Sequence, residues 1–418
     1  MEVSEERDLY LHSITAALER LNSAASECQS RLLSEHDGSI EDHSANQTAH
    51  DNLVQEAYKF LQIAQGPIDT VATCFERTAH VACARSLLEM GVFEGLPIGG
   101  ESRSTKELAE DLNVDEALLA RLMRNSALFE ETGPNQYRHT PFSEAYLRPE
   151  IRGMFRFAMD EHMPAHLKMH EFLKSNSWRE PTSTSNNPYT YAHDTNGKSM
   201  WEYLSERPTR MASFNDGMTL QAMTELWMID LFPWESLSDQ QPTPTTVVAV
   251  DIGGGTGMGI SRIRSYCCSL PGKFILQDQA HVIQSADPRG NGIEKMAYDF
   301  FEEQPIRGIT ISLPLGALTY LIRRCLHNWP QESIIQILKN VAAAMQPEKS
   351  RLLIEEIIVP DMNAGIEEGW MDMIMMNLGA KQRTLKEWEE VLALAGFEVR
   401  KIYQIPGNCH GLLEVWLK

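Results

Sequence analysis

The chain has 418 residues and a formal net charge of −21, from 37 Lys and Arg against 58 Asp and Glu. At about 150 residues per domain, this length predicts two or three domains. The shares of hydrophobic residues (43%) and charged residues (23%) are those of an ordinary globular protein. The acidic balance argues against general binding to nucleic acid or to an anionic membrane, because both require clustered positive charge.

The sequence shows no membrane-spanning or targeting pattern. No apolar stretch reaches the roughly 20 residues that a membrane span needs. The N-terminal segment MEVSEERDLY is too acidic and polar for a secretory or transit signal. The seven cysteines include no CxxC pair, which predicts reduced thiols without a disulfide framework and without a zinc or other metal site. We therefore expect a cytoplasmic protein.

The N-terminal segment is predicted to hold one helix and a linker. In residues 8–33, leucine and isoleucine recur at helical spacing, which indicates an amphipathic helix. Residues 34–50 are polar and nearly free of large apolar side chains, which predicts a flexible linker. Residues 1–50 therefore precede the first predicted domain.

A small, mainly helical domain is expected over residues 51–150. Two helical stretches lie in its second half, the first capped by Ser104 or Thr105 ahead of Glu107. Residues 135–147, NQYRHTPFSEAYL, then predict a small strand and turn. Two helices followed by a small strand and turn are typical of a winged-helix domain. Because the second helix is not strongly basic, we interpret the domain as a dimerisation module rather than a reader of DNA.

The rest of the chain predicts a helical region and an α/β domain. Residues 151–240 are rich in Met, aromatic residues and His at helical spacing; such a stripe is usually core, but Met also suits a pocket for a flat apolar substrate. The Pro/Thr-rich residues 240–246 mark a boundary. In residues 241–418, short β-branched strands alternate with helices, which predicts a mainly parallel, Rossmann-like sheet whose last strands can run antiparallel.

A glycine-rich turn follows the first strand of this domain. The strand VVAVDI runs directly into Gly253, Gly254, Gly255 and Gly257. Glycines permit positive φ and let a ligand approach the backbone closely. No Lys-Ser/Thr pair follows, and the GxGxxG register does not fit, so the turn is neither a P-loop nor a standard dinucleotide fingerprint.

Three acidic residues accompany the glycine turn. Asp251 precedes the glycines, Asp278 ends the next strand, and Asp299 follows near the third. An acid at the end of the second strand is placed to accept hydrogen bonds from ribose hydroxyls. Three acids would repel a pyrophosphate but suit a cationic nucleoside, and S-adenosylmethionine carries a sulfonium, an ammonium and no phosphate. The plainer alternative is an ordinary turn with solvated acids.

The motifs as a set resemble a known family. DIGGGTG, LQDQAHVI, YDFF, LHNWP, LLIEEIIVPD and GAKQRTLKEWEEVLALAGF follow in the order found in S-adenosylmethionine-dependent small-molecule O-methyltransferases. The nearest type is that of fungal and plant secondary metabolism, with an N-terminal winged-helix dimerisation domain. The resemblance covers residues from about 70 to 418 and implies a homodimer in which each N-terminal domain helps to close the partner's pocket.

The resemblance also implies the cofactor-binding residues. Gly253 and Gly255 would approach the amino-acid portion of S-adenosylmethionine, Asp278 the ribose, and Asp299 with Phe300 the adenine. A basic residue four positions before the LHNWP histidine would contact the cofactor, although a surface arginine on a helix is an equal alternative. The full predicted set is Asp251, Gly253, Gly255, Asp278, Asp299, Phe300 and Arg323.

His327 in LHNWP matches the general base of the family. A neutral imidazole can take the proton of a phenol or enol during methyl transfer, although a lone His is more often structural. Glu356 matches a supporting carboxylate, and Glu355 beside it should face the other way because strand neighbours alternate. Where the family has two further carboxylates, this chain has Asn328 and Gln382. Their loss weakens the stabilisation of an imidazolium.

Substrate-pocket candidates come from the helices of the middle region and from the helix before the KQRT motif. Each could equally be ordinary core or a helix-surface residue. The predicted set is His162, Phe214, Met218, Met223, Asp372 and Met376.

Three functional hypotheses follow. The first is methylation of a hydroxyl group on an aromatic or polyketide-type secondary metabolite, with His327 as base. The second is a redirected scaffold that catalyses a pericyclic or dehydration step and keeps the cofactor as an electrostatic element. The third, a non-catalytic binding protein, fits poorly with six preserved motifs. The stretch from residue 307 to the base is also longer than is usual in the family.

Overall fold

The structure, a computed structural model, describes residues 2–33, 40–224, 226–290, 292–307 and 316–418. Its elements form two compact units, Met1–Met159 with Ala212–Gly217, and Asp160–Met211 with Met218–Lys418. The four domain ranges expected from the sequence stay a prediction. No helix in the described parts of the chain is both long and apolar enough to cross a membrane.

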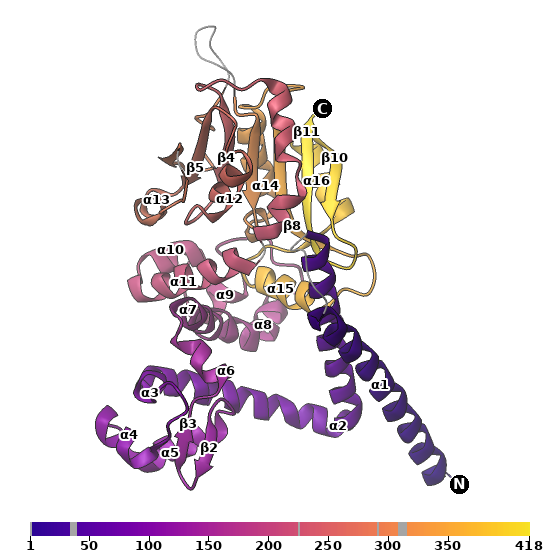
Figure 1. Cartoon of the computed structure of the whole chain (residues 1–418), viewed down its shortest axis with the longest axis vertical. Coiled ribbons are helices and arrows are strands. Elements are labelled where there is room, and N and C mark those ends of the chain that lie inside the picture. Colours follow the sequence, from indigo (N-terminus) through magenta and orange to yellow (C-terminus); the bar gives the residue numbers. More distant parts are fainter. Residues whose placement is uncertain (1, 34–39, 225, 291, 308–315) are drawn as a thin grey trace. The chain divides into compact units, whose positions relative to one another are not determined.

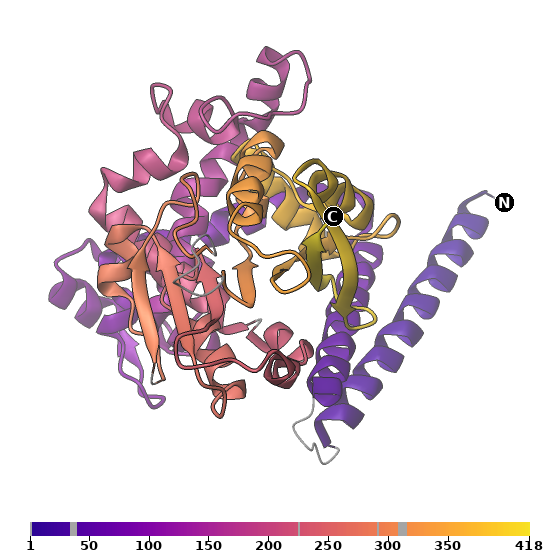
Figure 2. The same ribbon diagram turned by 90° about the horizontal axis from the view of Figure 1, so that it is seen from above.

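Two long helices, α1 (Glu2–Leu33) and α2 (Ile40–Met90), begin the first unit and lie side by side (Figures 1 and 2). The small buried residues Ala17, Ala24 and Ala49 allow this close packing. Residues 40–50, expected to be a linker, are helical, because packing against a neighbouring helix outweighs polar composition. The rest of the expected linker, residues 34–39, lies outside the described residues.

α2 is bent at Gly66, which has a φ of 68°. Pro67 follows, and a proline cannot continue the hydrogen-bond ladder of a helix. The two halves of α2 therefore point in different directions within the first unit.

The remainder of the first unit is a set of short helices around a three-stranded antiparallel sheet of order β1-β3-β2. Ser104 and Glu107 form the predicted capping box of α4. Only residues 136–138 of the expected strand and turn are extended, because Thr140 caps a helix that begins at Pro141. The elements are α3 (Val92–Gly95), β1 (Arg103–Ser104), α4 (Thr105–Leu112), α5 (Glu116–Asn125), β2 (Glu130–Gly133), β3 (Gln136–Arg138), α6 (Pro141–Glu144), η1 (Ala145–Leu147) and α7 (Pro149–Phe157).

Helices at the start of the second unit precede its sheet. A π-helical turn, η2 (Ala158–His162), and the helix α11 (Pro208–Thr224) each cross the division between the units. Between and after them come α8 (Met163–Ser175), α9 (Pro188–His193), α10 (Met200–Ser205), η3 (Leu226–Leu231) and η4 (Trp234–Gln240).

The sheet of the second unit confirms the predicted Rossmann-like α/β fold. Its order is β10-β11-β8-β7-β4-β5-β6, with β9 paired to β8. The neighbours from β8 to β6 run parallel, whereas β11 is antiparallel to both β8 and β10. The strands are β4 (Val247–Ile252), β5 (Lys273–Asp278), β6 (Ile293–Ala297), β7 (Thr319–Arg323), β8 (Arg351–Val359), β9 (Arg383–Thr384), β10 (Phe397–Gln404) and β11 (His410–Leu417).

Helices accompany the strands, and both faces of the sheet are apolar. Tyr320 and Ile354 belong to one buried cluster, whereas Leu321 and Leu353, their neighbours along the strands, belong to another. This alternation is the signature of a sheet covered on both sides. The accompanying helices are α12 (Met258–Tyr266), α13 (Ala280–Ser285), η5 (Leu326–Asn328), α14 (Gln331–Ala342), α15 (Ile366–Asn377) and α16 (Leu385–Leu394).

The strand order reverses between β4 and β7. From β4, the sheet continues through β5 to β6 on one side and through β7 to β8 on the other. In open α/β sheets a crevice forms outside the carboxyl ends of the strands at such a reversal. The long stretch noted before the base falls largely on residues 308–315, outside the described part of the chain.

Candidate active site

The glycine turn lies at the carboxyl end of β4. Gly253, Gly255 and Gly257 have φ values of 70°, 58° and 88°, where other residues are strained. The amides of Gly253 and Gly254 donate to the Gln277 carbonyl at 2.8 and 3.2 Å, which ties the turn to β5. A Cβ on Gly255 would meet nothing within 4 Å, so the turn borders open space.

Asp251 is turned inward, toward this turn. Its Oδ2 accepts a hydrogen bond from the Ile260 amide at 3.0 Å, and a Cβ on Gly254 would come within 2.6 Å of the carboxylate. Burial raises the pKa of Asp251 to about 7, against the lowering effect of Arg323. Its observed contact is therefore with the start of α12, and its predicted role toward the cofactor stays a prediction.

We expect Asp251→Asn to remove a pH-dependent part of the stability. A carboxyl group whose folded-state pKa is raised binds its proton more tightly than the unfolded chain does, so its contribution is present at low pH and is lost as pH rises toward 7. The slope is at most roughly 1.4 kcal/mol per pH unit. We expect the melting temperature of the variant to rise relative to that of the wild type as the pH increases from about 5 to 8. A constant difference would contradict this.

Asp278 faces the glycine turn from the end of β5. Its Oδ2 accepts from the Gly255 amide at 2.9 Å and its Oδ1 from the Gln279 amide at 2.7 Å. Burial raises its pKa, and these two hydrogen bonds oppose the shift. The structure therefore brings Asp278 and the glycines together, as the sequence analysis expected.

Asp299 and Phe300 follow β6. Asp299 is exposed, and its Oδ1 accepts from the Phe301 amide at 3.0 Å. A Cβ on Gly253 would lie 3.9 Å from the Phe300 ring, so this ring borders the glycine turn. Phe300 also meets Trp329 edge-to-face, with ring centroids 5.7 Å apart.

Arg323 ends β7 and is not on a helix surface. Its Nη1 lies 3.3 Å from Oε1 of Glu355, a fully buried carboxylate directly opposite it in the β7–β8 register. The expectation that Glu355 and Glu356 face opposite ways is confirmed, because Glu356 contacts His327 instead.

His327 and Glu356 form a buried pair at the carboxyl ends of β7 and β8. Nδ1 of His327 lies 2.6 Å from Oε2 of Glu356. The other oxygen, Oε1, accepts from the backbone amides of Cys325, Leu326 and His327 at 3.1, 2.9 and 3.3 Å. Burial alone would raise the pKa of Glu356, but the adjacent His327 holds it below the usual range. One carboxylate thus fixes both the turn and the imidazole.

Gln382 and Asp372 complete the surroundings of the imidazole. Nε2 of Gln382 lies 3.4 Å from Nδ1 of His327, and the Gln382 backbone amide donates to Oδ1 of Asp372 at 2.8 Å. Burial raises the pKa of Asp372. Asp372 therefore contacts the residue that borders the His327 ring, and its predicted role in a substrate pocket stays a prediction.

Of the other pocket candidates, His162 is buried at the end of the π-helical turn. Burial lowers its pKa to about 3, with a smaller effect from His166, so it is a neutral imidazole and not a helix-surface residue. Its ring centroid lies 6.4 Å from that of His166, which hydrogen-bonds the backbone of Met373 in α15. Met376, also in α15, is half-buried.

Phe214, Met218 and Met223 lie along α11. Phe214 belongs to the first unit, where its ring meets Phe157 edge-to-face at 5.2 Å. Met218 and Met223 belong to the second unit; Met218 is half-buried and Met223 is exposed. Their role in a pocket stays a prediction.

Two features near the site were missed from the sequence. Trp329 stacks on Trp201 at 6.2 Å, which ties α10 to the turn after His327. Buried Glu161 accepts from Arg210 and, at 2.6 Å, from the Tyr189 hydroxyl. The tryptophan of LHNWP was a usable signal, whereas nothing in the sequence pairs residues 161 and 210.

Similarity to known proteins shows the family of the chain. The O-methyltransferase domain family matches residues 179–398, and the chain belongs to that family. It is 97% identical, over 100% of both chains, to the O-methyltransferase afvC of Aspergillus flavus. Among solved structures, it is similar to OxaC in complex with sinefungin and meleagrin, at 33% identity and a TM-score of 0.84, covering 97% of this chain and 99% of OxaC.

A second solved structure is LepI in complex with S-adenosylmethionine, at 26% identity and a TM-score of 0.81, covering 96% of this chain and all of LepI. The protein is an O-methyltransferase of this family, and its cofactor is S-adenosylmethionine.

The residues at the carboxyl ends of β4 and β5 fit this cofactor. The open space beside Gly255 admits a ligand close to the backbone. The carboxylate of Asp278, already fixed by two amides, suits hydroxyl donors and complements a cationic ligand. When bound, S-adenosylmethionine supplies a methyl group activated by its sulfonium.

Proposed function

We propose that this enzyme methylates a hydroxyl group of an aromatic or polyketide-type secondary metabolite, with His327 as general base. The observation that carries the proposal is the 2.6 Å contact between Nδ1 of His327 and Oε2 of buried Glu356. A carboxylate at Nδ1 keeps the ring proton there and leaves Nε2 to accept a proton. The same carboxylate stabilises the imidazolium that forms when the substrate hydroxyl is deprotonated.

The substrate class is inferred from the helices that accompany the sheet. α15 carries Met376 and Asp372, and α8 carries His166, which bonds to α15. Thioether and imidazole groups suit a flat ring with few polar substituents. OxaC, a relative of known structure, is in complex with the small molecule meleagrin.

A second function is favoured by one specific feature. Gln382, at 3.4 Å from the His327 ring, is an amide where the family has a carboxylate, so the imidazolium is less stabilised than in a fully acidic surround. A solved structure described as a pericyclic reaction enzyme has the same fold, at 27% identity and a TM-score of 0.81. The second candidate is therefore a pericyclic or dehydration step without methyl consumption.

Incubation with methyl-labelled S-adenosylmethionine and a panel of phenolic, enolic and polyketide-type acceptors distinguishes the two. Label in the product, with one demethylated cofactor formed per product, supports methyl transfer. A substrate that is rearranged or dehydrated at constant cofactor concentration supports the second function instead and would rule out the first for that substrate.

We also propose that the enzyme is a homodimer formed through the first unit. After the bend at Gly66, exposed apolar side chains recur on α2 at spacings of three and four residues, which places them on one face of its second half. We call this set the α2 stripe: Ile68, Val71 and Phe75. Ile68 and Phe75 are 83% and 79% exposed, and a contiguous apolar face of this kind is covered in stable proteins. A second copy of the chain is the occupant that the family resemblance implies.

Phe75→Glu should weaken this dimer. A charge placed in an apolar interface costs at least about 2 kcal/mol, which corresponds to a roughly thirtyfold higher dissociation constant. Sedimentation velocity over a concentration series measures it. Phe142→Glu is the matched control, because Phe142 is 75% exposed in the same unit but lies on α6, outside the α2 stripe. Equal effects of both variants, or a wild-type monomer, would contradict the proposed interface.

A further inference from the structure

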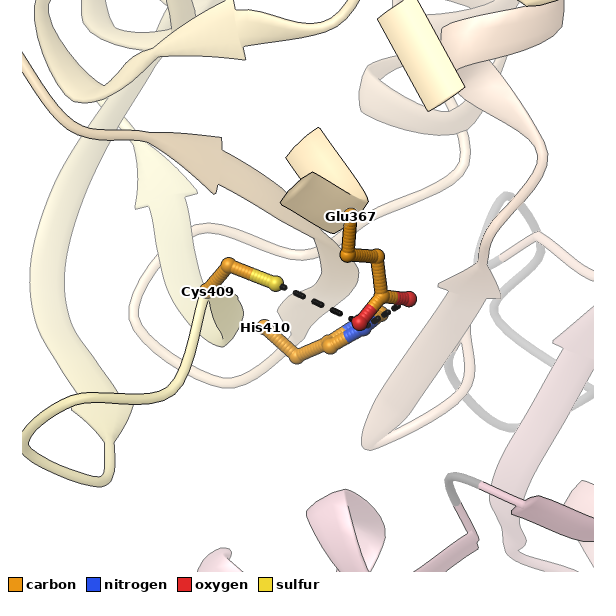
Figure 3. A group of neighbouring side chains, drawn as sticks. All are labelled: Glu367, Cys409 and His410. Carbon is orange, nitrogen blue, oxygen red and sulfur yellow. Dashed lines mark hydrogen bonds and ion pairs between the residues drawn. The ribbon is translucent and has the colours of Figure 1, made fainter. Parts of the chain in front are cut away.

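Three side chains of metal-binding type meet at the start of β11. Cys409 and His410 approach Glu367, which lies in the first turn of α15 (Figure 3). Nε2 of His410 is 3.3 Å from Oε1 of Glu367, and Sγ of Cys409 is 4.0 Å from Oε2. All three sets of ligand atoms lie within 4.8 Å of one another. None of these residues belongs to the methyl-transfer site described above.

These separations are close to those of a tetrahedral zinc site. With Zn–N and Zn–O bonds of about 2.0 to 2.1 Å and a Zn–S bond of about 2.3 Å, tetrahedral angles place N and O roughly 3.3 Å apart and S and O roughly 3.6 Å apart. The N–O separation, measured to Oε1 of Glu367, matches this geometry. The S–O separation of 4.0 Å is measured to the other oxygen, Oε2, so the carboxylate has to rotate for one of its oxygens to face both Nε2 and Sγ.

The backbone fixes one ligand and leaves another adjustable. His410 is buried and lies opposite Ile357 in the β11–β8 register. Its amide donates to Oδ1 of Asn408 at 2.8 Å, which holds the preceding turn. The side chain of Glu367 is 41% exposed, and Cys409 is half-buried. An ion can therefore reach a rigid imidazole from solvent, and the carboxylate can adapt to it.

We propose that Glu367, Cys409 and His410 bind one divalent transition-metal ion of the zinc type, with water in the fourth position. A thiolate and an imidazole together select zinc or its neighbours over magnesium and calcium, which require oxygen ligands. Three protein ligands and an open position are a common zinc arrangement. From the sequence, no metal site is predicted, because the chain has no CxxC pair. The proposed site uses only one cysteine, so the lack of such a pair does not argue against it.

The local charges agree with this choice. The hydrogen bond from His410 and the nearby Arg324 cation hold the pKa of Glu367 below its usual range, although partial burial opposes them. Glu367 is therefore an anionic ligand at neutral pH. Since Arg324 already places a positive charge beside the site, binding depends on the metal–thiolate bond more than on charge alone. Binding replaces the His410–Glu367 hydrogen bond and releases the Cys409 proton to solvent, so the affinity should rise with pH.

The test uses full-length, tag-free protein freed of metal by a chelator. Cobalt(II) is the optical probe, because thiolate coordination to cobalt produces a charge-transfer absorption band, and zinc(II) is titrated by calorimetry. We expect one ion per chain and a thiolate–cobalt band that Cys409→Ser abolishes. Glu367→Gln, at a partly exposed position, should weaken zinc binding by at least about tenfold. Cys268→Ser, which alters an exposed cysteine elsewhere in the same unit, should leave both readouts unchanged.

A folded wild-type protein without a thiolate–cobalt band would overturn the proposal. So would a band that persists in Cys409→Ser or disappears in Cys268→Ser. Circular dichroism of each variant establishes that it is folded. If Cys409→Ser does not fold, the Glu367→Gln titration decides, because unchanged zinc affinity in that variant would equally exclude the site.

Discussion

His327→Ala should lower kcat about 10²- to 10⁴-fold, the usual contribution of a positioned general base. The imidazole is the group that we propose takes the substrate proton, and it lies against buried Glu356 at 2.6 Å. The dissociation constant of S-adenosylmethionine should change little, because Asp278 and the glycine turn are untouched. Single-turnover methyl transfer and calorimetric titration of the cofactor measure the two quantities separately.

His170→Ala is the matched control for this variant. His170 is an exposed histidine on α8 in the same unit, and its removal should leave kcat unchanged. A His327→Ala enzyme with nearly full kcat would show that the substrate loses its proton without this base. An equal loss of kcat and cofactor affinity would point instead to a collapsed site.

Glu356→Gln should lower kcat by a similar or larger factor without removing His327. In the wild type, Oε1 of Glu356 accepts three backbone amides and Oε2 faces Nδ1 of His327. A glutamine can keep its oxygen on the three amides, but its NH₂ group then faces Nδ1. To avoid two opposed donors, the imidazole must move its proton to Nε2, where it cannot act as a base. In a Ser-His-Asp triad this tautomer change costs about 10⁴-fold in kcat.

Glu355→Gln is the control for this substitution. Glu355 is an equally buried carboxylate one position away, but it pairs with Arg323 on the other face of β8. Its change should affect cofactor affinity more than kcat. If Glu355→Gln and Glu356→Gln lowered kcat equally, the loss would be due to the removal of a negative charge from β8 and not to the tautomer of His327.

Glu356→Gln also has an expected stability signature. Because the folded-state pKa of Glu356 lies below its ordinary value of 4.5, its ionised carboxylate contributes stability at neutral pH. This contribution is lost as pH falls through the lowered pKa. The difference in melting temperature between wild type and variant should therefore shrink in acid.

The sequence was informative where a local rule determines the structure. The predicted strand VVAVDI coincides with β4, and Asp278 ends β5 as expected, because short apolar runs between turn signals have few alternatives. The opposite orientations of Glu355 and Glu356 follow from strand alternation alone. The proximity of Asp278 to the glycine turn follows from the adjacency of two parallel strands.

Features that depend on tertiary packing could not be predicted. The polar segment at residues 40–50 is helical because a neighbouring helix covers it. Asp251, predicted as a ligand contact, bonds to the start of α12, since the glycines remove the side chains that would exclude it. The burial of His162 depends on a π-helical turn, which the spacing of residues in the sequence does not indicate.

The two ends of the large sheet have a consequence for self-association. An unpaired strand edge is a template on which other chains can add strands. At one end, β6 carries Glu294 and Lys295 at exposed positions. At the other, seen in yellow in Figures 1 and 2, β10 carries Arg400 and Lys401, and its register with β11 is interrupted between Val399 and Lys401. Within the described sheet, both edges are thus poor templates for strand addition, and high local concentrations of the enzyme should not lead to edge-to-edge pairing of its sheets.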